Sequence, residues 1–303
     1  MKIMIMAAGA VGGYFGSVLS QKNEVTFIAR GQHLENIQSK GLKIISETSG
    51  NYISKSPATS YPEHTYKPDL VLYCVKAYQN EQAIDLIRPF VGKDTTILSL
   101  QNGIGIGHQL EENFGVDKTL LGSAYIEASV DSPGVIIERG GLCQIRFGSP
   151  LGIISEKEQR ISRLLNECSI NHVLSKDIST DLWEKLIFIS ALSGMSCITR
   201  STFQEIIGNK LGKQATESLL EETHSVALAD GANISKHVIS EIMTHFIDQK
   251  SKLVSSMYKD MVDGKPMEVD VINGAVSKLG KKYGIPTPIN DLIYAALNIH
   301  AQN

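Results

Sequence analysis

The hydrophobic positions of this chain follow two different patterns, and the change between them divides the 303 residues into two parts. In the first half, short apolar runs bounded by polar or glycine residues predict buried strands at 2–6, 24–29, 70–75, 96–100 and 120–128. Helices are predicted at 10–21 and 80–90, between strands. This alternation is typical of a mainly parallel sheet covered by helices.

The first half is predicted to end in an antiparallel pair of strands. Segments 135–138 and 143–147 are apolar and flank the sequence ERGGL. A short, glycine-containing connection between two such runs predicts a hairpin. We expect it at the edge of the sheet.

After about residue 152 the strand-like runs give way to helical periodicity. The predicted helical stretches are 156–168, 178–198, 211–230, 235–260, 268–283 and 288–301. Glycine and proline separate the later ones. The sequence therefore predicts an α/β domain over 1–152 and an all-α domain over 153–303, with a ligand cleft between them.

The segment MAAGAVGGYFG, residues 6–16, resembles the dinucleotide-binding pattern G-x-G-x-x-G with Ala7 in place of the first glycine. A methyl group there is tolerated if φ stays negative, whereas a positive φ would cost roughly 1–2 kcal/mol. The glycines that admit the pyrophosphate and the close helix–strand contact, Gly9 and Gly12, are present. A strand precedes the loop, and a helix and a second strand follow it, as a Rossmann-type domain requires. We expect the cofactor to be bound by Ala7, Ala8, Gly9, Ala10, Val11 and Gly12; the alternative is a purely structural turn.

The residue that ends the second strand indicates which dinucleotide is bound. An NAD-binding domain usually has Asp or Glu there, which binds the ribose 2′-hydroxyl. This chain has Arg30, followed by Gly31 and Gln32. A guanidinium can pair with a 2′-phosphate, and no neighbouring carboxylate repels that phosphate. The sequence therefore favours NADP, with a solvated surface arginine as the alternative.

Three further segments contain candidate chemistry. CVKAYQ and LQNGIG place Lys76 and Asn102 just past strand ends, where open α/β sheets bind ligands. DLWEKLIF places Lys185 on an otherwise apolar helix. Each signal alone is weak, because side chains at strand ends are often merely solvated and because Asp181 and Lys185 could form an ordinary i, i+4 pair.

Composition narrows the class of protein. A net charge of −3 and a pI near 6.3 provide no basic face for nucleic acid. The four cysteines are scattered without a C-x-x-C pair, which argues against a zinc site or a disulfide framework. No secretory signal or apolar run of about 18 residues is evident. We expect a soluble cytoplasmic protein with a small-molecule substrate, without metal, nucleic-acid or membrane partners, and leave a homodimer open.

The motifs in their order resemble the ketopantoate reductases (2-dehydropantoate 2-reductases) over essentially the whole chain. They are GAVGGYFG, FIARG, VKAYQ, QNGIG, LWEKL, SSMYKDMVDGKPMEVDVINGAV and GIPTPIN. The resemblance implies a Rossmann domain joined to a helical domain, with NADPH and substrate in the cleft. It also implies reduction of 2-dehydropantoate to (R)-pantoate, a step in the synthesis of pantothenate and coenzyme A.

The resemblance also implies roles for individual residues. Lys185 would be the general acid that protonates the ketone oxygen, and Glu268 would bind the substrate hydroxyl as the second catalytic residue. Ser256 would contact the substrate, while Lys76 and Asn102 would serve the nicotinamide side and position the ketone. A proton-donating cation suits the negative charge that hydride addition builds on the oxygen. We expect Ser256 and Glu268 on successive helices joined by the DGKP turn.

The chain departs from well-studied members at three positions where they have asparagine. Ile189, Ser193 and Leu253 stand there, and of these only Ser193 keeps a polar group for substrate binding. A polar substrate group that faces an aliphatic side chain loses a hydrogen-bond partner, which costs about 1–3 kcal/mol of binding free energy. Arg200 is an alternative partner for a carboxylate. The alternative functions are reduction of another 2-keto acid and, in a different class, an NADPH sensor without turnover, which would not need Lys185.

Overall fold

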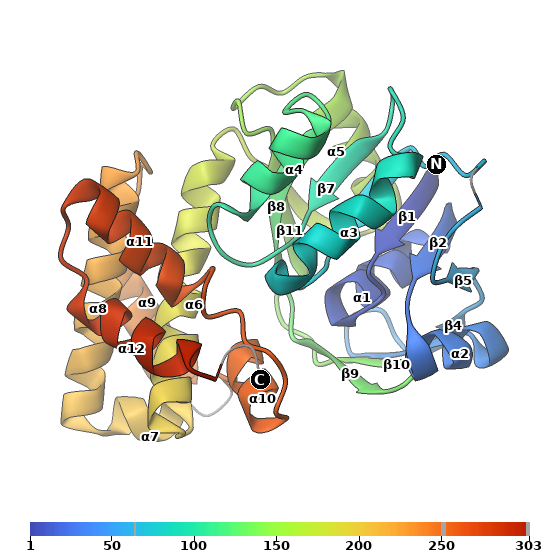
Figure 1. Cartoon of the computed structure of the whole chain (residues 1–303). Coiled ribbons are helices and arrows are strands. Elements are labelled where there is room, and N and C mark those ends of the chain that lie inside the picture. The colour runs from blue at the N-terminus through green and yellow to red at the C-terminus, as the bar shows by residue number, and fades with distance from the viewer. Residues whose placement is uncertain (64, 250–252, 301–303) are drawn as a thin grey trace. The chain divides into compact units, whose positions relative to one another are not determined.

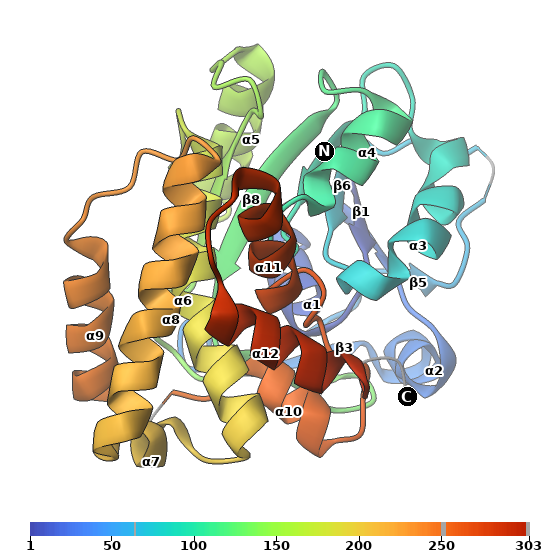
Figure 2. The same ribbon diagram turned by 60° about the vertical axis from the view of Figure 1, so that its left-hand side comes forward.

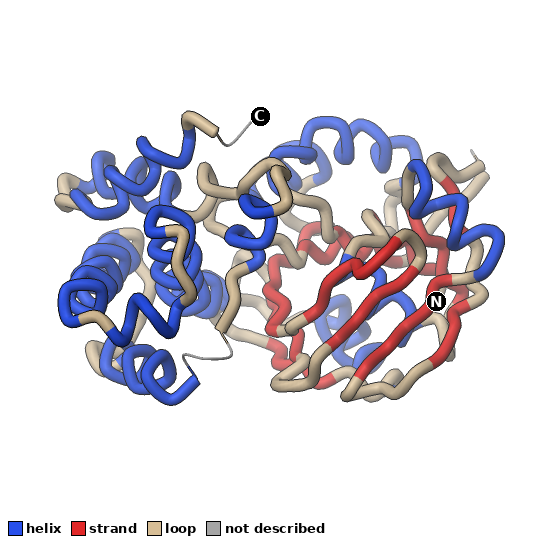
Figure 3. Tube along the Cα trace, turned by 90° about the horizontal axis from the view of Figure 1, so that it is seen from below, coloured by secondary structure: helices blue, strands red, loops and turns tan. Residues whose placement is uncertain are grey.

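The computed structural model describes residues 1–63, 65–249 and 253–300, which form two compact units. The first unit consists of residues 1–101 and 106–178, and the second of residues 102–105 and 179–303. Within the described residues all strands belong to the first unit, while the second is built from helices and turns (Figure 3). An α/β unit followed by a helical one confirms the predicted fold class.

A mostly parallel eight-stranded sheet forms the centre of the first unit. Its strand order is β12-β11-β8-β7-β6-β1-β2-β5. The strands are β1 (Lys2–Met6), β2 (Glu24–Ile28), β5 (Ala58–Thr59), β6 (Leu70–Tyr73), β7 (Thr96–Ser99), β8 (Thr119–Tyr125), β11 (Gln144–Gly148) and β12 (Asn171–Leu174). Only the β8–β11 pair is antiparallel. The predicted strands at 2–6, 24–29, 70–75 and 96–100 are thus confirmed.

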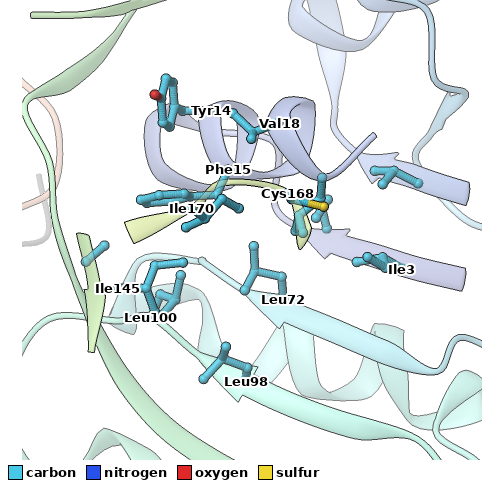
Figure 4. Packing of buried hydrophobic residues seen from close by; sticks show 14 of the residues in the cluster. Ile3, Tyr14, Phe15, Val18, Leu72, Leu98, Leu100, Ile145, Cys168 and Ile170 are labelled. Carbon is cyan, nitrogen blue, oxygen red and sulfur yellow. The ribbon is translucent and has the colours of Figure 1, made fainter. Parts of the chain in front are cut away.

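Helices connect the strands of this sheet (Figure 1). They are α1 (Ala10–Leu19), α2 (Gly31–Lys40), α3 (Asn80–Ile87), α4 (Ile106–Phe114) and α5 (Glu156–Glu167), with 3₁₀ turns at Ala77–Gln79 and Arg88–Phe90. Phe15 of α1 belongs to one buried apolar cluster with Ile3, Leu72 and Leu98 of the sheet (Figure 4). Since β1 and β6 are buried on both faces, they appear as continuous apolar runs rather than alternating ones.

The predicted hairpin of 135–138 with 143–147 is wrong. Strand β10 (Val135–Glu138) lies in a separate four-stranded sheet of order β4-β3-β10-β9. It pairs parallel to β3 (Leu42–Ser46) and antiparallel to β9 (Ala128–Ser132), while β4 (Tyr52–Ser54) flanks β3. Strand β11 instead pairs with β8 and β12 of the main sheet. The predicted strand 120–128 is likewise two strands, β8 and β9, one in each sheet.

The first unit extends beyond residue 152, where the sequence places the domain boundary. Helix α5 packs against β12, and β12 adds a parallel strand to β11, so residues 153–178 belong to the first unit. The boundary lies at Ile178 because these residues complete the edge of the sheet.

Seven helices are described in the second unit. They are α6 (Ile178–Thr199), α7 (Phe203–Gly208), α8 (Lys210–Ala229), α9 (Val238–Gln249), α10 (Ser256–Val262), α11 (Asn273–Tyr283) and α12 (Pro288–Asn298). Helix α8 contacts α7, α9, α11 and α12 (Figure 2). The stretch predicted as one helix at 235–260 contains two, α9 and α10, and residues 250–252 of it lie outside the described residues.

Helix α6 provides much of the core of the helical unit. Trp183, Ile187 and Ala191 are fully buried and pack with residues of the surrounding helices. Among the described helices α6 is also the one with the length and hydropathy to cross a membrane, and 61% of its apolar window is buried inside the protein. A buried core helix satisfies the same two criteria.

Candidate functional site

The glycine loop and Lys76 follow neighbouring strands of the main sheet. Strand β1 pairs with β2 on one side and with β6 on the other, so the order of connections reverses at β1. In open α/β sheets, ligands bind at the carboxyl edge where this reversal occurs. Residues 7–12 follow β1 and Lys76 follows β6 at this edge, with Met6 beside Tyr73 in the register. The fold therefore brings both sequence candidates to one edge.

The glycines of the loop differ in what surrounds them. A Cβ atom on Gly12 would lie 2.1 Å from the Ala7 carbonyl oxygen, so only glycine fits where α1 passes the end of β1. A Cβ on Gly9 would meet nothing within 4 Å, so this position faces open space. Among the described residues, the non-glycine positions with positive φ are Cys143, Ser169 and Arg200, so Ala7 does not incur the cost of a positive φ. This leaves room for a ligand at Gly9, at the N-terminus of α1, where backbone N–H groups favour anions.

Arg30 lies two residues after the end of β2 and occupies the N-cap position of α2. Its side chain is exposed and donates a 3.4 Å hydrogen bond to the side-chain carbonyl of Gln82. The next two residues, Gly31 and Gln32, are uncharged, so no carboxylate follows the strand directly. A 2′-phosphate at the end of β2 would therefore find a cation and no adjacent acid.

In the helical unit, Lys185 and Asn102 form a direct hydrogen bond. Lys185 Nζ donates to Asn102 Oδ1 at 2.8 Å, from α6 to the short segment 102–105. Burial lowers the pKa of the Lys185 ammonium to about 8, and the negative charge of Glu268 opposes this decrease. An ammonium with a lowered pKa, held by a neutral amide, can donate a proton near neutral pH.

The segment 102–105 packs against the turn that contains Glu268. Gly103 has φ of +100°, and a Cβ there would lie 2.4 Å from the Val271 carbonyl oxygen. The Ile104 N–H donates to the same carbonyl at 3.4 Å. Glu268 itself is 5% exposed. The structure thus brings together Asn102, Lys185 and Glu268, which are far apart in the sequence.

Glu268 does not lie on a helix, contrary to the prediction. Residues 265–272 are turns and irregular structure, and α11 begins only at Asn273. The turn is fixed by buried Met267 and Val269 and by a hydrogen bond from the Val271 N–H to the Glu268 carbonyl. This irregular backbone lets Gly103 approach closely.

Ser256 is the predicted substrate contact, but the adjacent Ser255 is the buried serine of the pair. Ser256, the first residue of α10, is exposed, whereas Ser255 is 3% exposed. Ser255 Oγ donates to Ser193 Oγ at 2.8 Å and accepts from the Tyr258 N–H. The sequence offered no signal for Ser255 beyond its position beside Ser256.

The two aliphatic replacements contact the helical core. Ile189 and Leu253 are partly buried and pack against the apolar cluster of this unit. Arg200 is exposed at the end of α6, where its φ is +52°. No group of three or more metal-ligating side chains occurs among residues 1–63, 65–249 and 253–300.

Comparisons with known proteins cover both units. Residues 3–151 match the family model described as ketopantoate reductase PanE/ApbA, and residues 177–301 match the model of its C-terminal part. The chain is 30% identical to the 2-dehydropantoate 2-reductase of Pyrococcus horikoshii, over 97% of this chain and 96% of that protein.

Solved structures agree with this relationship. The 2-dehydropantoate 2-reductase of Geobacter metallireducens matches with a TM-score of 0.93 and 25% identity, over 99% of each chain. A ternary structure of D-mandelate dehydrogenase with NADH and anilino(oxo)acetate matches with a TM-score of 0.90 and 26% identity, over 99% of this chain and 98% of that one. With both units matched in order along the chain, this protein belongs to the ketopantoate reductase family of oxidoreductases.

Proposed function

We propose that this protein reduces 2-dehydropantoate to (R)-pantoate with NADPH, as a cytoplasmic step in the synthesis of pantothenate and coenzyme A. The observation that carries the proposal is the hydrogen bond from Lys185 to Asn102 beside buried Glu268. A lysine with a lowered pKa in this setting suits a general acid. The choice of 2-dehydropantoate as the proposed substrate comes from the relatives named 2-dehydropantoate 2-reductase.

In this proposal each residue has a defined task. A dinucleotide bound at the glycine loop would supply the hydride to the carbonyl carbon. The Lys185 ammonium donates its proton to the carbonyl oxygen, so the ketone becomes an alcohol and neutral Lys185 regains a proton from solvent. Asn102 orients the ammonium. The negative charge of Glu268 stabilises the protonated form of Lys185, and its carboxylate accepts a hydrogen bond from a substrate hydroxyl.

NADPH rather than NADH is proposed because of Arg30. Its guanidinium is exposed at the end of β2, available to a 2′-phosphate. The D-mandelate dehydrogenase of similar fold was solved with NADH, so NADH is the alternative dinucleotide for this fold. The choice therefore depends on the residues at the end of β2 in each protein.

A second candidate is the reduction of a more apolar 2-keto acid. It is favoured by the aliphatic side chains of Ile189 and Leu253 at positions where a polar substrate would need hydrogen-bond partners. The fold of D-mandelate dehydrogenase, solved with anilino(oxo)acetate, which carries a phenyl ring, is compatible with such a substrate.

The test is the oxidation of NADPH, followed by its absorbance, with 2-dehydropantoate and with a panel of 2-keto acids of increasing apolar character, including phenylglyoxylate. We expect kcat/KM to be highest for 2-dehydropantoate. A higher value for an apolar keto acid would establish the second candidate. Absence of turnover with every keto acid, despite NADPH binding, would indicate a sensor.

A further inference from the structure

His33 links the glycine loop to two other parts of the first unit. It lies in the first turn of α2, three residues after Arg30, and its ring is partly buried. His33 Nε2 lies 2.8 Å from the Ala8 carbonyl oxygen. On its other side, the Gly134 N–H donates to His33 Nδ1 at 3.0 Å. A nitrogen that accepts cannot also carry the proton, so Nε2 is the protonated nitrogen and donates to Ala8.

Ala8 is thereby held through both of its backbone groups. Its N–H donates to the Ile28 carbonyl at 2.8 Å, and its carbonyl accepts from His33. Its side chain is 2% exposed. The first bond fixes the Ala7–Ala8 peptide unit, and the His33 bond sets the orientation of the next one, between Ala8 and Gly9.

This peptide unit has a direct consequence for Gly9. In a trans peptide the carbonyl oxygen and the following N–H point in opposite directions. Because the Ala8 carbonyl is turned toward His33, the Gly9 N–H is turned away from it. Gly9 is the residue of the loop at which a Cβ would meet nothing within 4 Å. A ligand can therefore approach the backbone of Gly9 closely, and an N–H that points away from His33 is suited to the pyrophosphate of a dinucleotide.

The other contact of His33 is also built for close approach. Gly134 has φ of +82°, and a Cβ there would lie 2.8 Å from Asn36 Cβ on α2. The Gly134 carbonyl accepts from the Lys43 N–H of β3 at 2.9 Å. The turn between β9 and β10 thus packs against α2, and its hydrogen bond to Nδ1 fixes the orientation of the His33 ring.

We infer that His33 is a positioning residue for the cofactor: its neutral imidazole sets the Ala8–Gly9 peptide so that the Gly9 N–H binds the pyrophosphate. This deepens the proposed function, since it rests on dinucleotide binding at the glycine loop. It applies to NADPH and NADH alike, because both contain the pyrophosphate. Arg30, at the N-cap position of the same helix, would contact only the 2′-phosphate.

The test compares ligands that do and do not contain a pyrophosphate. Dissociation constants are measured for NADPH, NADH and adenosine 2′-monophosphate with the unmodified protein, His33→Leu, His33→Asn and His33→Gln. Leucine cannot donate to Ala8, and the asparagine amide is too short to replace Nε2, whereas the glutamine amide reaches nearly as far. Gln38→Leu is the matched control, since Gln38 on α2 donates to the Ala58 carbonyl, away from the loop.

We expect His33→Leu and His33→Asn to weaken NADPH and NADH by about tenfold, the effect of roughly one lost hydrogen bond, and adenosine 2′-monophosphate by less than about twofold. His33→Gln should recover most of the affinity, and Gln38→Leu should leave it unchanged. Should His33→Leu fail to fold, the asparagine and glutamine variants still provide the comparison.

Two results would overturn the inference. One is unchanged dinucleotide affinity in the folded His33 variants; the other is an equal loss for all three ligands, which would mean a general disturbance of α2. If the unmodified protein binds neither dinucleotide, the proposed function fails together with this inference. If it binds and reduces keto acids while the His33 variants retain full affinity, the inference alone fails.

Discussion

Lys185 Nζ and Asn102 Oδ1 are 2.8 Å apart although 83 residues separate them in the chain. Asn102 lies three residues after the end of β7, and Lys185 lies on α6. The bond joins a cation with a lowered pKa to a neutral acceptor, which orients the proton without removing it. The first predictions concern this pair.

Removing the ammonium should abolish proton donation without affecting the cofactor. We expect Lys185→Met to lower kcat by about 10²–10⁴-fold, the usual contribution of a general acid, with the dissociation constant for NADPH nearly unchanged. Steady-state rates and NADPH titration measure the two effects. Near-normal turnover of this variant would reassign the acid, and Lys76 is then the next candidate.

Keto acid reduction by the unmodified protein should depend on pH in one direction. Only the protonated lysine can donate, and burial lowers the pKa of Lys185 to about 8. The rate should therefore be high below this value and fall as the pH rises through about 8. A kcat that stays constant well above this pH would contradict the role of Lys185.

Two substitutions should move this pH dependence in opposite directions. Asn102→Asp would place a carboxylate beside Lys185 Nζ and raise the pKa of the lysine, so the fall in rate should move to higher pH by about 1–3 pH units. Glu268→Gln removes a negative charge that now raises the pKa of Lys185, so the fall should move to lower pH. Full pH profiles of kcat for both variants measure these shifts. Shifts in the same direction would show that Lys185 is not the group that titrates.

Cofactor preference should depend on Arg30. In Arg30→Ala we expect the affinity for NADPH to decrease by about tenfold or more and the affinity for NADH to stay within about twofold, because the lost charge-assisted bonds go only to the 2′-phosphate. Titration of both dinucleotides tests this, with Arg88→Ala, on the same unit, as a control for loss of one exposed arginine. Equal affinities of the unmodified protein for both dinucleotides would contradict the assignment of NADP.

The two loop glycines should fail in different ways when replaced by alanine. In Gly12→Ala the methyl group would meet the Ala7 carbonyl, so we expect a loss of stability of about 1–3 kcal/mol or more, seen as a lower Tm. In Gly9→Ala the methyl group meets no protein atom within 4 Å, so the Tm should be retained while NADPH binding is lost. Normal NADPH affinity in Gly9→Ala would place the pyrophosphate elsewhere.

Much of the first unit could be predicted from local pattern. Strand β1, the glycine loop, α1 and β2 follow one another within about 30 residues, so their apolar periods and turn residues are sufficient to identify them. The same holds for the helical character of the second unit. The candidate residues Lys185 and Glu268 were identified by resemblance of ordered motifs, which does not require knowing the packing.

The pairing of distant segments could not be predicted. Strand β10 has the apolar pattern of any half-buried strand, and its partners β3 and β9 were decided by how the two sheets pack. The boundary at Ile178 likewise depends on the pairing of β12 with β11.

The sequence by itself thus determined the class of fold, because this depends on local pattern. The cofactor loop and the reacting groups are its predictions, made from residue type and from the order of the motifs. Only the tertiary structure decided that Asn102 accepts from Lys185, that Glu268 lies in a turn, and that His33 holds Ala8. These relationships depend on contacts between segments remote in the chain, and such contacts follow from packing and burial rather than from periodicity.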